Sequence, residues 1–300
     1  MEFAGGIELD QRTEDIVLGF TIPARSGRGR LMRLGDSLNV VLSAHDYPPR
    51  LAKLLGEAII LTGLIGSALK GNEGQTTVQA RAEGGLVDLL VCDYRAGEVR
   101  GYLSFEPEAA DLPEGAPLSE IFGTGYLAVT IDPSDGRERY QGIVDLKGDT
   151  LAEAAERYFQ SSEQIPTILR ADVRFGADGW HAGGMLLQHL GRKEEGGPRL
   201  HVENEREDWA HLEALGSTVT AEELSDPGLT FPELLWRLFN EDEVRIIPPV
   251  PISRGCRCSV PMIEERLSTL PGDQKAEIRD EDGLVRVDCE FCSRQFAVRV

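Results

Sequence analysis

Four of the five cysteines lie near the C-terminus, in two closely spaced pairs. One residue separates Cys256 from Cys258, and two residues separate Cys289 from Cys292. Thirty residues (259–288) lie between the pairs. Structural zinc ions are commonly held by four thiolates at the corners of a tetrahedron. Because each short loop can offer two sulfurs, the spacing predicts one zinc ion per chain, bound by all four cysteines.

The single residue between Cys256 and Cys258 leaves two interpretations open. A disulfide between these neighbours would close a small, strained ring, and strained disulfides are typically labile or regulatory. The site could therefore act as a thiol switch. It could instead be a structural zinc clip that lets a small acidic tail fold, which is the more common use of four-thiolate sites. A disulfide framework is not expected, since the chain is large and shows no secretory signal.

The other chemistry-bearing residues form no recognisable catalytic site. Cys92 follows an apolar run and has no histidine close in sequence, so it is expected to be a small buried residue. The five histidines show neither metal-site nor triad spacing. We expect His45 to support a turn, and His181 and His189 to lie on the surfaces of strands or loops. A hydrolase or transferase is therefore the least supported class, and the protein is not expected to be an enzyme.

The composition narrows the function classes further. The net charge is -20, from 51 acidic and 31 basic residues. Such a surface repels nucleic-acid phosphates, although acidity also simply keeps proteins soluble. No run of eighteen apolar residues occurs, so no membrane span is predicted. Together with thiols that need a reducing compartment, this predicts a cytoplasmic protein that binds neither nucleic acid nor membrane.

The rest of the sequence, which must position the cysteines, predicts an α+β protein. After an acidic N-terminal stretch, the pattern predicts a mostly antiparallel N-terminal domain with packed helices. A mostly apolar helix over 50–70, rich in small residues, is expected in its core. Thr150 is expected to cap a helix to about Ser162, with Glu153 completing a capping box. Strands are expected within 15–49, 72–105, 123–149 and 165–190.

The composition changes after Leu190, where charged residues and glycines become frequent. Short acidic helices follow, one starting near Thr220 and the next with Pro232 in its first turn. Helices this short are marginal alone and must pack on something. We therefore divide the chain into an N-terminal core domain (1–190), a metastable helical linker (191–251) and a small C-terminal zinc-binding domain (252–300).

Several blocks, in this order, resemble the heat shock protein 33 family, the redox-regulated holdase chaperones of the bacterial cytoplasm. The resemblance covers nearly the whole chain and includes the two cysteine pairs with their thirty-residue gap. The other blocks are His45–Pro48, Gly123–Val144, Gly148–Thr167, Ala182–Gln188 and Leu234–Val244.

This resemblance implies a mechanism. In the reduced, inactive state the four cysteines would hold zinc as thiolates and steady the linker. Oxidation would pair Cys256 with Cys258 and Cys289 with Cys292, release the zinc and unfold the linker. The exposed apolar surface would then capture unfolding client proteins without ATP, and family members dimerise when active. The main alternative is a constitutive zinc-ribbon adaptor that binds partner proteins without redox switching.

The family commonly continues well beyond the second cysteine pair, whereas this sequence stops at Val300. The final stretch, Gln295–Val300, is still expected to form a strand that closes a zinc ribbon.

Overall fold

The computed structural model describes residues 14–69, 74–134, 136–190 and 202–299. Its helices are α1 (Asp36–Leu42), α2 (Pro49–Ala68), α3 (Leu118–Phe122), α4 (Leu151–Tyr158), α5 (Val202–Gly216), α6 (Ala221–Ser225), α7 (Phe231–Phe239), α8 (Val260–Ser268) and α9 (Gly272–Glu277). Its strands are β1 (Ile16–Ile22), β2 (Gly27–Leu34), β3 (Gln75–Glu83), β4 (Val87–Arg95), β5 (Glu98–Phe105), β6 (Thr124–Asp132), β7 (Tyr140–Asp145), β8 (Thr167–Gly176), β9 (Gly179–His189), β10 (Arg245–Pro251), β11 (Ser253–Arg254), β12 (Leu284–Asp288) and β13 (Gln295–Arg299).

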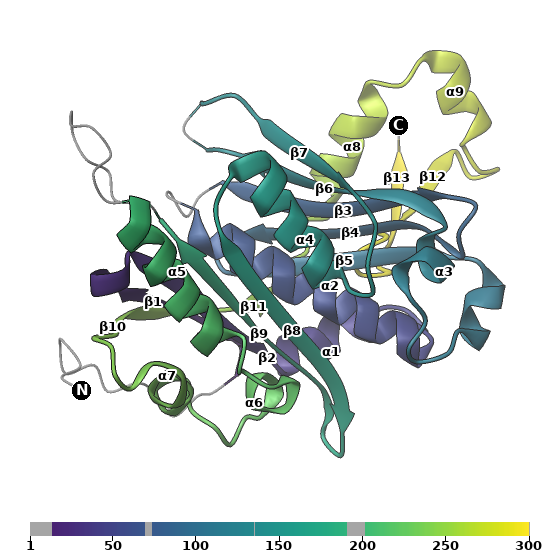
Figure 1. Cartoon of the computed structure of the whole chain (residues 1–300). Helices are drawn as coiled ribbons and strands as arrows, with labels where there is room; N and C mark the ends of the chain where they lie inside the picture. The colour runs from purple at the N-terminus through teal and green to yellow at the C-terminus, as the bar shows by residue number, and fades with distance from the viewer. Residues whose placement is uncertain (1–13, 70–73, 135, 191–201, 300) are drawn as a thin grey trace.

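The strands form two large sheets and a small hairpin (Figure 1). Sheet A has the order β10-β1-β2-β9-β8, and sheet B has the order β11-β5-β4-β3-β6-β7. Neighbouring strands run antiparallel, apart from the short parallel pair β11 and β5. The hairpin consists of β12 and β13. The predicted α+β class with mostly antiparallel sheets is therefore confirmed.

Helix α2 lies between the two sheets and contacts strands of both. Its small residues permit this close packing: a Cβ on Gly63 would lie 2.4 Å from the Met32 sulfur of β2, and one on Gly66 would lie 2.4 Å from the Tyr94 ring of β4. The helix is long and apolar enough to cross a membrane, but 83% of its most apolar window is buried inside the protein. The prediction of a core helix is confirmed. Sheet A, sheet B and α2 are called the frame below.

Helices α5, α6 and α7 pack on the face of sheet A that points away from α2. Side chains alternate along a strand, so Val17 faces the α2 side while Leu18, Phe20 and Ile22 face the helices. The resulting second core is formed from the sheet side by Leu18, Phe20, Ile22, Leu31, Ile168, Met185 and Leu187, and from the following segment by Leu212, Val219, Leu224, Leu229, Phe231, Leu234, Leu235, Leu238, Phe239 and Val244. These short helices thus cover an apolar surface.

Arg33 of β2 fastens this segment to the frame. Its side chain is 1% exposed, and its guanidinium donates hydrogen bonds to the carbonyl oxygens of Glu223, Leu224 and Leu229. The backbone of α6 also approaches β9 closely: a Cβ on Gly183 would lie 1.9 Å from the Leu224 carbonyl oxygen. This contact accounts for the glycine at position 183.

Two local predictions need correction. Residues 245–251 were expected to belong to a helical linker, but they form β10, which pairs with β1 at the edge of sheet A. Three prolines make a helix unfavourable there, whereas an edge strand tolerates them. At α4, Thr150 accepts from the Glu153 N–H as expected, but the Glu153 carboxylate accepts from the Asp149 N–H, so the predicted capping box is incomplete. A π-helical turn (Phe159–Glu163) continues α4, so the predicted helix end near Ser162 is confirmed.

Candidate metal centre

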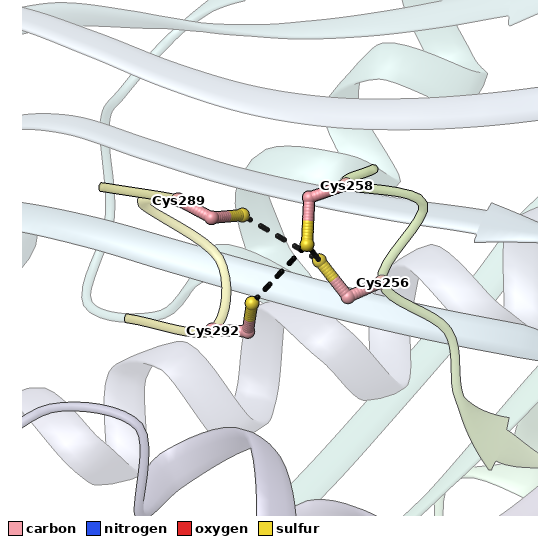
Figure 2. Close-up of side chains that lie close together, drawn as sticks. All are labelled: Cys256, Cys258, Cys289 and Cys292. Atoms are coloured by element: carbon pink, nitrogen blue, oxygen red, sulfur yellow. Dashed lines mark hydrogen bonds between the residues drawn. The ribbon is translucent and has the colours of Figure 1, made fainter. Parts of the chain in front are cut away.

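Two loops bring the four C-terminal cysteines together. Cys256 and Cys258 follow β11, whose end is tied to β5 by the hydrogen bond from Gly255 N–H to the Val99 carbonyl oxygen. Cys289 and Cys292 lie in the turn between β12 and β13, where the Cys292 and Ser293 N–H groups donate to the Cys289 carbonyl. Figure 2 shows the four sulfurs pointing toward one another from these two loops.

The distances between the sulfurs fit one metal ion. The four ligand atoms all lie within 4.8 Å of one another. Cys256 Sγ lies 3.3 Å from Cys258 Sγ and 3.5 Å from Cys289 Sγ, and Cys258 Sγ lies 3.5 Å from Cys292 Sγ. A tetrahedral zinc site with Zn–S bonds of about 2.3 Å needs sulfurs roughly 3.8 Å apart. All four cysteines are free thiols in the structure, so the cluster could hold a thiophilic metal.

The cluster disfavours several negative charges unless a cation is present. Burial raises the pKa of Cys256, but hydrogen bonds from the Cys258 backbone and the neighbouring thiols outweigh it and lower the pKa to about 7. Burial, followed by the neighbouring Cys256, raises the pKa of Cys258 and of Cys289. Cys256 therefore ionises first and makes further ionisation harder. A bound divalent cation would offset this repulsion, as expected for a four-thiolate site.

Cys92, His181 and His189 are all buried in the structure. Cys92 is fully buried next to α2, as predicted, and burial raises the pKa of its thiol. The prediction that His181 and His189 lie on the surface is wrong, since they are 5% and 6% exposed. His181 contacts the carboxylates of Glu14 and Asp178, and His189 lies beside Trp209 of α5.

Sequence reasoning did not single out the residues between the paired cysteines or the frame residues beside them. His45, expected only to support a turn, lies next to the second cysteine loop, and its Nε2 is 2.6 Å from the Glu290 carbonyl oxygen. These two residues are 245 positions apart, so the sequence carries no local signal for the contact.

Comparisons with known proteins agree with the fold. Residues 15–299 match the family model described as "Hsp33 protein". A 33 kDa chaperonin of Caulobacter vibrioides is 40% identical over 291 residues, covering 94% of this chain and 93% of that protein. A 33 kDa chaperonin of Shewanella loihica is 34% identical over 285 residues, covering 95% and 93%.

A solved structure shows the same fold at lower sequence identity. The crystal structure of the 33 kDa chaperonin (heat shock protein 33 homolog) of Thermotoga maritima superposes with a TM-score of 0.77 at 20% identity, covering 95% of both chains. The match of the family model over nearly the whole chain, together with relatives at 34–40% identity, places this chain in the Hsp33 family.

Proposed function

We propose that this protein is a redox-regulated, ATP-independent holdase chaperone and not an enzyme. In the reduced state, Cys256, Cys258, Cys289 and Cys292 bind one zinc ion, and the protein is inactive. Oxidation forms the Cys256–Cys258 and Cys289–Cys292 disulfides, abolishes the zinc site and lets the linker unfold. The protein then binds unfolding client proteins in the cytoplasm as a homodimer, and it binds neither nucleic acid nor membranes.

One observation carries this proposal: the cysteine cluster directly follows the segment that covers the apolar face of sheet A. Side chains of α5, α6 and α7 pack on seven apolar residues of that face. Fully burying one such side chain stabilises by roughly 1.5–3 kcal/mol. Loss of the covering segment would therefore expose a surface able to bind the apolar side chains of unfolding proteins.

The redox step is balanced within each cysteine pair. Two thiolates give up two electrons and form one S–S bond, while hydrogen peroxide takes those electrons and two protons and becomes two water molecules. A bound zinc ion would keep the sulfurs deprotonated before oxidation. A paired sulfur is no longer a thiolate ligand, so both disulfides together remove the binding site.

The energies favour unfolding after the site is lost. Metal binding by a small four-thiolate module contributes on the order of 10 kcal/mol of folding free energy. The short helices α6 and α7 are marginal without packing partners. We accordingly assign residues 1–190 to a domain that binds clients and dimerises, 191–251 to a metastable linker and 252–300 to the redox switch.

The test measures zinc content and suppression of aggregation of a thermally unfolding client, before and after peroxide at elevated temperature. We expect one zinc ion per reduced chain, lost as holdase activity rises. Activity that is indifferent to oxidation, with zinc retained, would contradict the switch and leave the constitutive zinc-ribbon adaptor.

A further inference from the structure

All three residues that lie between paired cysteines contact the frame or the loop that joins α1 to α2. Arg257 Nη1 donates to Gln75 Oε1 of β3 at 2.6 Å. The Glu290 carbonyl oxygen accepts from His45 Nε2 at 2.6 Å. The Arg100 guanidinium of β5 lies over the Phe291 ring, 4.1 Å from its centroid. Both cysteine loops are thus held from outside by the residues nearest to their sulfurs.

A row of polar side chains on sheet B connects two of these contacts. Gln75 Nε2 donates to Thr77 Oγ1 at 3.1 Å, and Thr77 Oγ1 donates to Asp93 Oδ1 at 2.6 Å. Arg100 Nε donates to Asp93 Oδ2 at 2.7 Å. Asp93 is only 4% exposed, so its pairing with Arg100 is shielded from water. The hydrogen bonds run from Arg257 in the first loop to the arginine that stacks on Phe291 in the second.

This row lies on the face of sheet B that points away from α2. Val78, Leu90 and Cys92 point toward α2 and belong to its core, so their strand neighbours Thr77 and Asp93 point to the opposite face. The cross-strand register places Thr77 opposite Asp93 and Asp93 opposite Arg100. Figure 1 shows the β12–β13 hairpin beside these strands.

His45 makes a third support beside the row. Its ring contacts the rings of Tyr47 and Tyr102, at centroid distances of 5.3 and 5.4 Å. Ser293, the residue after Cys292, donates from Oγ to the Ala44 carbonyl oxygen at 2.5 Å. The second loop therefore has contacts on both sides of Cys292, through Glu290 before it and Ser293 after it.

We infer that the outer face of sheet B and the loop before α2 position the two cysteine loops for metal binding, with Gln75, Arg100 and His45 as positioning residues outside the ligand set. The inference rests on the proposed metal site and goes beyond it, because it assigns part of the site's stability to the frame. Groups that orient metal ligands are commonly worth 10–100-fold in metal affinity. Loss of any one support lets a loop leave the tetrahedral arrangement.

The experiment compares Arg100→Ala with Arg81→Ala in the full-length reduced protein. Arg81 is an exposed arginine on the same face of sheet B, so it is the matched control. Zinc transfer to a chromogenic chelator is followed over time, and the thiolate-to-metal absorption of the cobalt-loaded protein reports the coordination geometry. We expect about tenfold faster zinc release and an altered cobalt spectrum for Arg100→Ala, but wild-type behaviour for Arg81→Ala. Arg100→Lys, which keeps the charge, should partly restore slow release.

A second variant separates positioning from folding. Phe291→Leu removes the ring under Arg100 while leaving the frame unchanged, so it should release zinc faster at an unaltered melting temperature of the frame. Wild-type release rates in both Arg100→Ala and Phe291→Leu would overturn the inference and leave the metal site intact. A wild-type protein that binds neither zinc nor cobalt would overturn both the inference and the proposed function.

Discussion

At the scale of single residues, the cysteines differ in how easily each loses its proton. The hydrogen bonds around Cys256 lower its pKa to about 7, whereas burial raises the pKa of Cys258 and Cys289. A metal is the natural way to hold all of them as thiolates, because each further negative charge is otherwise costly.

Replacing one clustered cysteine should therefore remove the metal. We expect Cys258→Ser to lower zinc content from one ion per chain to well below one, measured by elemental analysis after dialysis. Cys92→Ala is the matched control, since Cys92 is buried beside α2, away from the cluster. Full zinc retention in Cys258→Ser, or zinc loss in Cys92→Ala, would contradict the assignment.

Arg33 holds the middle of the linker, at residues 223–229, against sheet A. Burial lowers the pKa of Arg33 to about 10, so its guanidinium stays charged at neutral pH. The guanidinium carbon lies 4.8 Å from the centroid of the Phe231 ring. Arg33→Met would leave the Glu223, Leu224 and Leu229 carbonyls without this donor, at a cost of about 2–4 kcal/mol. We expect faster amide hydrogen exchange in α6 and α7 and measurable holdase activity in the reduced protein. The exposed Arg245→Met is the control, and identical exchange in both variants would exclude a role for Arg33.

At the scale of elements, α6 and α7 each begin with a capping box. Thr220 and Glu223 exchange side-chain and backbone hydrogen bonds, and Thr230 and Glu233 do the same. The pKa of Glu223 is lowered mainly by its hydrogen bond with the backbone N–H of Thr220. The pKa of Glu233 is lowered mainly by its hydrogen bond with the Thr230 hydroxyl. The caps therefore depend on ionised glutamates.

Acid should loosen both helices. Each glutamate has a folded-state pKa below its ordinary value of 4.5, so its stabilisation is complete above about pH 4.5 and is lost as the pH falls through the lowered value. We expect exchange of α6 and α7 amides, corrected for intrinsic rates, to rise below that pH. Glu233→Gln keeps an acceptor but does not titrate, so it should flatten the response of α7. An unchanged response in that variant would show that another group is responsible.

Local signals predicted some elements well, and long-range contacts explain where they failed. The helix start near Thr220 and the Pro232 start of α7 were readable because start signals lie within a few positions of each other. The capping boxes at Thr220 and Thr230 were equally local but were not predicted. Strand β10 was not readable, since its partner β1 lies more than 200 positions earlier and only the folded sheet offers that edge.

The same distinction applies to the site. The four cysteines could be predicted from spacing alone, because metal geometry fixes which short loops can contribute two thiolates. Arg257 and Gln75, in contrast, are 182 positions apart, and the row beneath them requires the register of β3, β4 and β5. Burial of His181 was equally invisible, because its carboxylate partner Glu14 lies 167 positions away.

At the scale of the whole molecule, one continuous segment links the helices that cover the apolar face of sheet A (α5, α6 and α7) to the cysteines. After α7, β10 pairs with β1 at the edge of sheet A, and β11 then pairs with β5 at the edge of sheet B. Between them, Ile252 N–H donates to the Asp15 carbonyl oxygen at 2.7 Å. Gly255 and Cys256 come three and four residues after Ile252, so the proposed loss of the metal site would act on the chain next to these pairings.

The most direct test follows hydrogen exchange by mass spectrometry and zinc content in the same reduced and peroxide-treated samples. We predict that zinc loss coincides with fast exchange across residues 202–251, while α2, β3 and β4 stay protected. Zinc loss with residues 202–251 still protected would contradict the account, because the cysteine cluster would then be a local clip that does not control the apolar face of sheet A.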